Sequence, residues 1–184
     1  MTSTSELTFK PEVNSFKNIS MYYPEDKFTF MLEPSKCPFG VSFNRGKGEV
    51  VLSIENEEHT NMFNEIDHQV EVFAENMEFP ESCSMRRSLY QKGNYPPTLK
   101  VKLPPTATFY DTENMIRDIN YIEKMDKLMC ECEVSGLWQN DNAYGVSYRA
   151  TKVQVIKGGK GKPVRRDKAQ AYAFNDDDED DVEP

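Results

Sequence analysis

The sequence predicts a mainly β domain with one or two helices, followed by a disordered acidic C-terminal tail. Three observations lead to this prediction. Short apolar segments are separated by turn residues, one segment changes to helical spacing, and acids are concentrated at the C-terminus. Several short strands interrupted by a helix are typical of a small Greek-key barrel, so we expect an OB-fold-like barrel. The alternative that the alternation leaves open is a β-sandwich.

The length of 184 residues suits one domain with extensions. We expect an N-terminal extension or first strand over residues 1–27 and the OB-fold-like domain over 28–156. A basic flexible linker is expected over 157–174 and the acidic tail over 175–184. The chain has no apolar run of about 18 residues and no secretory signal at its start, so we expect no membrane contact and an intracellular location.

The first half of the domain reads as three strands and a helix. Strands are expected over 27–33, 39–44 and 49–55, with turn signals between them. Over residues 57–75 the spacing of apolar residues changes from two to three and four, which predicts a helix with Asn56 as its N-cap. The apolar residues spaced by three and four along one helix face are Met62, Phe63, Ile66, Val70 and Phe73.

The second half begins with a long polar segment, 80–98, and a short strand, 99–103, that stops at two prolines. Residues 112–127 space their apolar side chains like a helix, so a short second helix is expected there. The clearest hairpin runs from 128 to 156 and turns at 139–142. Strict alternation in this hairpin places Trp138 on the face of the cysteines.

Metal, cofactor and catalytic sites are not expected. The four cysteines are Cys37, Cys83, Cys130 and Cys132. They form no CxxC pair, and His59 and His68 lie nine residues apart on the predicted helix, so their side chains should not converge. We interpret the cysteines as reduced structural thiols and the histidines as surface residues. The sequence contains no phosphate-binding loop and no nucleophile elbow, so we do not expect an enzyme.

The net charge of −9 is divided unevenly along the chain. Residues 157–168 hold six bases and one acid, a local charge of +5. Seven acids and no base lie in the tail, at Asp176, Asp177, Asp178, Glu179, Asp180, Asp181 and Glu183. Removing the −7 of the tail and the +5 of the linker leaves the body at −7. Nucleic acid would therefore need a local basic and aromatic groove on this chain.

Two segments supply bases and aromatic rings together, which is what single-stranded nucleic acid requires. Rings stack on unpaired bases and cations hold the phosphates. The candidate DNA-binding residues of the first segment are Arg86, Arg87, Tyr90, Lys92, Tyr95, Lys100 and Lys102. Those of the final hairpin are Trp138, Tyr144, Tyr148, Arg149 and Lys152. For each ring, the alternative is a place in the core.

Two stretches, 88–105 and 134–157, followed by the acidic end, resemble single-stranded-DNA-binding proteins of large eukaryotic DNA viruses. That group is similar to the OB-fold replication protein of short-tailed phages. The most specific piece is the Trp-(x)5-Tyr-Gly-x-Ser-Tyr-Arg-Ala pattern at 138–150. The resemblance implies strand coating in viral DNA replication, recombination and repair. It also implies a homodimer, contact of the tail with polymerase or helicase, and a location in the host nucleus or a cytoplasmic viral factory.

The resemblance places a DNA-binding role on the candidates inside the two stretches, Lys100 and Lys102 in the first and Trp138 to Lys152 in the second. Arg86 and Arg87 depend on the residue pattern alone. The phage relatives end in an aromatic residue, whereas here Phe174 precedes the acids. An acidic tail can compete with DNA for a basic groove or present charge to basic partners. Two rival functions are an acidic protein-interaction adaptor and an RNA-binding OB module.

Overall fold

The computed structural model describes residues 6–16 and 18–158. The predictions for the linker beyond residue 158, for Phe174 and for the acidic tail lie outside the described residues. The domain itself is mainly β, with one α-helix, as the sequence predicts. None of the helices in the described residues combines the length and apolar character that crossing a lipid bilayer requires.

All described strands belong to one sheet with the order β1-β2-β11-β12-β8-β5-β4. The seven strands of this path are β1 (Phe9–Phe16), β2 (Ile19–Pro24), β4 (Val41–Asn44), β5 (Lys47–Ser53), β8 (Thr98–Leu103), β11 (Lys127–Gln139) and β12 (Ala143–Ile156). The others are β3 (Thr29–Lys36), β6 (Ser84–Arg86), β7 (Leu89–Tyr90), β9 (Thr108–Tyr110) and β10 (Ile116–Arg117). No pairing joins β1 to β4 among the described residues, so this OB-like sheet is curved but not closed.

The hairpin of β11 and β12 is the longest in the sheet, and two bulges change which side chains face the core. Residues Cys130, Cys132 and Val134 are buried, as alternation predicts. The register then shifts between Val134 and Gly136, and Leu137 becomes fully buried. A bulge inserts one residue and reverses the faces beyond it. The prediction that Trp138 shares the cysteine face is therefore wrong: it lies on the opposite, outer face.

A second bulge lies on β12, where Thr151 is the added residue opposite the step from Glu131 to Cys132 on β11. Ala150 and Val153 both enter the core as a result, although they are three residues apart. Lys152, which strict alternation places beside Ala150, projects outward instead. Bulges of this kind leave little trace in an alternation pattern because only one residue is added.

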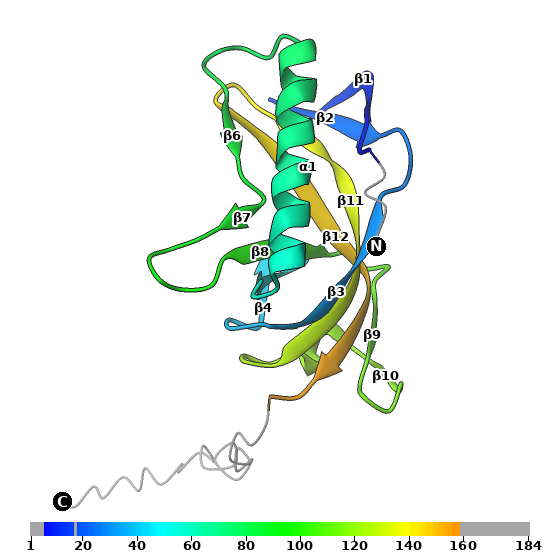
Figure 1. Cartoon of the computed structure of the whole chain (residues 1–184). Helices are drawn as coiled ribbons and strands as arrows, with labels where there is room; N and C mark the ends of the chain where they lie inside the picture. The colour runs from blue at the N-terminus through cyan, green and yellow to red at the C-terminus, as the bar shows by residue number, and fades with distance from the viewer. Residues whose placement is uncertain (1–5, 17, 159–184) are drawn as a thin grey trace, which may run out of the picture.

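Helix α1 (Glu57–Asn76) covers one face of the sheet (Figure 1). Its buried stripe includes Phe63, Ile66 and Val70, in agreement with the predicted periodicity. Asn56 is the N-cap: its side-chain oxygen accepts from the backbone N–H groups of Glu58 and His59 at 2.7 and 3.3 Å. Phe63 packs edge-on against Phe30 and Tyr148, which joins the helix to the sheet.

The predicted second helix over 112–127 is wrong. The segment contains β10 and a short 3-10 helix, Ile119–Tyr121. The Asp111 carboxylate accepts from the backbone N–H groups of Glu113 and Met115, a local alternative to helical hydrogen bonds. Asn114 and Met125 have positive φ angles of 62° and 70°, which a continuous helix does not permit. Met115, at the start of the expected apolar stripe, is 57% exposed.

Strands β1 and β2 pair as a hairpin, which joins the sheet through β2 and β11. Its base is fixed to helix α1. The Phe9 and Tyr22 rings each lie 5.4 Å from the Phe73 ring, and the Leu7 N–H donates to the Gln69 side chain at 2.8 Å. The sequence anticipated at most one strand here, because buried apolar residues are few in this hairpin.

Cys37, Cys130 and Cys132 are buried free thiols, and burial raises the pKa of Cys37 to about 11. Cys83 is partly buried, His59 is half-buried and His68 is exposed. Within residues 6–16 and 18–158, no group of three potential ligands is placed to hold a metal ion. Cys37, Cys130 and Cys132 belong to the hydrophobic core cluster, where they pack as small apolar side chains.

We expect Asn56→Ala to lower the free energy of unfolding by about 1 kcal/mol, because two helical N–H groups lose their acceptor. Urea denaturation of the full chain measures this value. Asn61→Ala, at an exposed position inside the same helix, is the control and should change stability by less than about 0.5 kcal/mol. Equal losses in both variants would contradict the capping role.

Candidate nucleic-acid interface

The outer face of β5 and β8 carries the two lysines that the sequence places together. On β8, Leu99, Val101 and Leu103 are buried, whereas Lys100 and Lys102 alternate with them and point outward. The antiparallel register sets Lys100 opposite Val51 and Lys102 opposite Glu49.

A groove of about 370 Å³ crosses this face from β2 to β5. We call it the tryptophan groove. The side chains that define it are Ile19, Met21, Glu49, Lys100, Lys102 and Trp138. It combines the Trp138 ring, apolar side chains and two ammonium groups with one carboxylate, and Val146, Ser147 and Tyr148 of β12 complete its lining. Such a surface can accept an unstacked base and hold the adjoining phosphate.

Two glycines allow the Trp138 ring to take its position. A Cβ atom at Gly145 would lie 3.1 Å from Cζ2 of Trp138 and 3.0 Å from the backbone oxygen of Arg86. A Cβ atom at Gly136 would lie 3.0 Å from the backbone oxygen of Tyr22, and its φ of 155° also favours glycine. The indole therefore lies close over β12, and Arg86, which pairs with Gly145, stands beside it.

The two lysines of the tryptophan groove have different environments. Lys100 forms an ion pair with Glu49, with 3.3 Å between its ammonium nitrogen and the carboxylate oxygen. The Lys102 ammonium donates to the Ser147 hydroxyl at 3.1 Å. Burial, followed by the charge of Lys47, lowers the pKa of Lys102. A phosphate near Lys102 would offset this desolvation, so Lys102 is the stronger candidate for phosphate contact.

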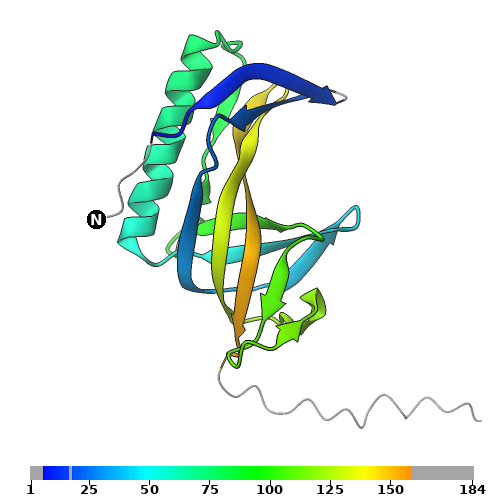
Figure 2. The ribbon, with the colours of Figure 1, turned by 90° about the vertical axis from the view of Figure 1, so that its right-hand side faces the viewer.

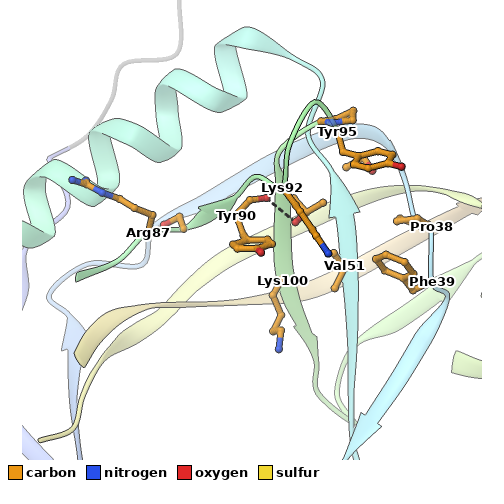
Figure 3. A pocket seen from close by; sticks show the side chains of 12 residues that line it. Pro38, Phe39, Val51, Arg87, Tyr90, Lys92, Tyr95 and Lys100 are labelled. Carbon is orange, nitrogen blue, oxygen red and sulfur yellow. Dashed lines mark hydrogen bonds between the residues drawn. The ribbon is translucent and has the colours of Figure 1, made fainter. Parts of the chain in front are cut away.

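A second groove, of about 760 Å³, lies at the other end of the same face. We call it the tyrosine groove. Its principal side chains are Phe39, Val51, Tyr90, Lys92, Tyr95 and Lys100. Figure 3 shows the three rings around the groove with the Lys92 side chain extending among them. The exposed fractions of Phe39, Tyr90 and Tyr95 are 65%, 67% and 75%.

No carboxylate lines the tyrosine groove among the described residues. Because Lys100 borders both grooves, they form one path along the outer face. Of the predicted residues, the structure brings together Arg87, Tyr90, Lys92, Tyr95, Lys100, Lys102 and Trp138 on this path, with Arg86 adjacent. Phe39 is a groove residue that the sequence analysis placed in a strand; its position between Pro38 and Gly40 was the available turn signal.

Segment 84–90, which carries the two arginines and Tyr90, is held by a buried polar network. The Asp67 carboxylate, 1% exposed on helix α1, accepts from the backbone N–H and the hydroxyl of Ser88. The Ser88 hydroxyl also bonds the Tyr148 hydroxyl. Burial raises the pKa of the Asp67 carboxyl, and the Ser88 hydrogen bonds oppose that rise. The sequence analysis missed both Asp67 and Ser88 because polar core contacts follow no periodicity.

Tyr144 lines neither groove, and Tyr148 borders the tryptophan groove but is almost fully buried. Tyr148 is 2% exposed and packs against Phe30 and Phe63, so its ring cannot meet a base in this structure; burial also raises its pKa. The Tyr144 ring lies 5.3 Å from Phe79, on the helix side of the sheet. Both tyrosines take the alternative that the sequence left open, a packing role.

Arg87 and the remaining predicted cations are paired with glutamates. Arg87 bonds Glu71 at 2.8 Å, and Lys152 bonds Glu131 at 3.1 Å. Arg149, next to Lys102 in the sheet, bonds the buried carboxylate of Glu133. Burial alone would raise the pKa of Glu133, but its hydrogen bonds and charge contacts with Lys27 and Arg149 prevail and lower it. These three cations are therefore partly neutralised before any ligand arrives.

No protein-family model and no curated protein match this chain. Solved structures do match its fold. The crystal structure of gp2.5, a single-stranded DNA-binding protein encoded by bacteriophage T7, has a TM-score of 0.52 and 14% identity. The alignment covers 74% of this chain and 96% of that one. The single-stranded DNA-binding protein from bacteriophage Enc34 has a TM-score of 0.54 and 12% identity, covering 92% and 100%.

A further structure holds the Enc34 protein in complex with single-stranded DNA. Its TM-score is 0.52 and its identity 11%, and the alignment covers 80% of this chain and 94% of that chain. At these identities the likeness establishes a shared fold. The residue roles on the present chain rest on its own grooves.

We expect Ser88→Ala to lower the free energy of unfolding by about 1–3 kcal/mol, because the buried Asp67 carboxylate loses a hydroxyl donor. Urea denaturation with Trp138 fluorescence measures the change. Ser82→Ala, at an exposed position six residues earlier, is the control and should remain within about 0.5 kcal/mol of the wild type. A Ser88→Ala variant as stable as the control would show that the network does not hold the segment.

Proposed function

We propose that this protein binds and protects single-stranded DNA with little sequence preference and has no catalytic activity. The observation that carries the proposal is the single path of exposed rings and lysines formed by the two grooves, which meet at Lys100. Stacking on a ring tolerates any base, since every base has a flat face. The shared fold with phage single-stranded DNA-binding proteins supports this assignment.

In this proposal, the single-stranded DNA follows the outer face from the tyrosine groove to the tryptophan groove. Bases would stack on Tyr90, Tyr95 and Phe39 at one end and on Trp138 at the other. Lys92, Lys100 and Lys102 would hold phosphates, while Arg86 would extend the path beyond Trp138. Because several neighbouring cations already have glutamate partners, we expect stacking to supply most of the affinity.

We further propose a role in viral DNA replication and recombination, within the host nucleus or a cytoplasmic viral factory. The acidic tail, residues 175–184, would compete with DNA for the grooves or recruit a polymerase or helicase. A homodimer belongs to the same proposal. The charge division along the chain and the resemblance of two stretches to viral proteins support these roles.

One observation favours a second candidate function, an acidic protein-interaction adaptor. Glutamates pair with Arg87, Arg149 and Lys152, and the body of the chain is acidic. A surface with neutralised cations attracts phosphate weakly. An RNA-binding role is the third possibility, since rings accept bases of either nucleic acid.

We expect Trp138→Ala to weaken binding of a mixed-sequence single-stranded DNA oligomer by about tenfold or more, since stacking contributes about 1–3 kcal/mol per base. Fluorescence anisotropy at several salt concentrations measures both affinity and salt dependence. The slope of log affinity against log salt should stay unchanged. Lys102→Ala should instead flatten this slope by about 0.7 for one lost phosphate contact.

Lys36→Ala, an exposed lysine at the end of β3 outside both grooves, is the control and should match the wild type. Absence of wild-type binding at low salt would refute the DNA proposal and favour the adaptor. Tighter binding to a matched RNA oligomer would favour the RNA module.

Removal of residues 170–184 should tighten DNA binding if the tail competes for the grooves. The same anisotropy titration compares the full chain with a chain ending at Ala169, which keeps the basic residues 157–168. We expect the difference to shrink at high salt, because competition between acids and phosphates is electrostatic. Equal affinities at low salt would contradict tail competition and leave the recruitment role.

A further inference from the structure

The β1–β2 hairpin is anchored at one end only. Leu7, Phe9 and Tyr22 at its base are 5%, 4% and 7% exposed and pack toward helix α1. Every residue of β1 after Phe9 is exposed. Figure 2 shows the distal part projecting beyond the sheet on the side opposite α1, the same side as the β4–β5 hairpin. The two hairpins thus stand on either side of the outer face.

One side of this hairpin faces the tryptophan groove, and the other lies on the side of Tyr22 and helix α1. Ile19 and Met21 line the tryptophan groove, and Met21 is the β2 partner of Trp138 in the sheet register. Phe16 pairs with Ile19 across the hairpin, which places its side chain on the groove side. Val13 pairs instead with Tyr22, whose ring is packed toward the helix, so Val13 lies on the other side.

We propose that the β1–β2 hairpin is a nucleic-acid-binding arm that forms the second wall of the tryptophan groove. This inference rests on the proposed function and assigns a part of the chain to DNA contact that the residue pattern did not. A base stacked on Trp138 lies within reach of Met21, because the two residues are register partners. Ile19 then covers the neighbouring base or sugar.

The chemistry of the arm sets the kind of contact. On the groove side, Asn14 pairs with Met21 and is polar, whereas Ile19, Met21 and Phe16 are apolar. These three apolar side chains bury against bases and sugars and do not bind phosphates. The cations of the groove, Lys100 and Lys102, lie across from the arm on β8. The arm therefore contributes affinity that is independent of salt, whereas β8 contributes the salt-dependent part.

The test compares two double variants of the full chain. Ile19→Ser/Met21→Ser removes the apolar wall of the groove. Val13→Ser/Val72→Ser is the matched control, because Val13 and Val72 are 49% and 43% exposed, as against 45% for Ile19, and lie outside both grooves. Anisotropy titration of a labelled single-stranded DNA oligomer at several salt concentrations gives affinity and slope. Urea denaturation followed by Trp138, the single tryptophan, checks the fold.

We expect the Ile19/Met21 variant to bind about tenfold more weakly with an unchanged salt slope, and the control to remain within about twofold of the wild type. If the wild type binds and the Ile19/Met21 variant loses no affinity, the proposal of a DNA-binding arm is refuted. The proposed function is then unaffected. Equal weakening of both variants also refutes the arm, since hairpin stability would then be the cause. Absence of wild-type binding refutes the proposed function itself, and the arm with it.

Discussion

One buried carboxylate determines where the basic and aromatic segment of this protein lies. Asp67 is almost fully removed from water on helix α1, and a carboxylate in that position is costly unless it is hydrogen-bonded. Ser88 supplies both a backbone and a hydroxyl donor, and its hydroxyl also meets Tyr148 of the central hairpin. The helix, segment 84–90 and the sheet therefore meet at a single point. From that point Tyr90 is directed into the tyrosine groove and Arg86 toward Trp138.

The outer face combines stacking surfaces with charged side chains. Its exposed rings stand beside lysines, while glutamates neutralise several cations near its margins. An exposed ion pair such as Lys152–Glu131 contributes little stability, so a phosphate could replace that carboxylate at small cost. The buried Glu133 carboxylate differs, because losing Arg149 would leave it poorly compensated. This arrangement reconciles an acidic body with the proposed binding of a polyanion. It also makes the rings, rather than the overall charge, the feature on which the proposal depends.

Glycines and bulges determine how the central hairpin presents its side chains. Gly136 follows an added residue in β11, and beyond it the faces exchange, so that Leu137 enters the core and Trp138 leaves it. Because Gly145 has no side chain, the Trp138 indole can lie against the β12 backbone. Without the bulge, the ring would point toward helix α1. The groove thus depends on two positions that carry no side chain.

Local sequence patterns predicted much of this architecture. Helical spacing predicted α1 and its Asn56 cap, and alternation predicted that Lys100 and Lys102 project together, because periodicity alone decides which residues share a face. Local patterns failed where periodicity does not encode the feature that prevails, such as a side-chain cap, a positive φ angle or a bulge. Asp111 and positive φ angles replaced the expected second helix, and a bulge moved Trp138 to the outer face. The sequence by itself determined the helix, the strands β3, β4, β5, β8, β11 and β12, and the rings and cations available for a site. Only the tertiary structure decided which of them meet, because burial of Tyr148, the Asp67 network and the groove at Lys100 join residues from separate elements.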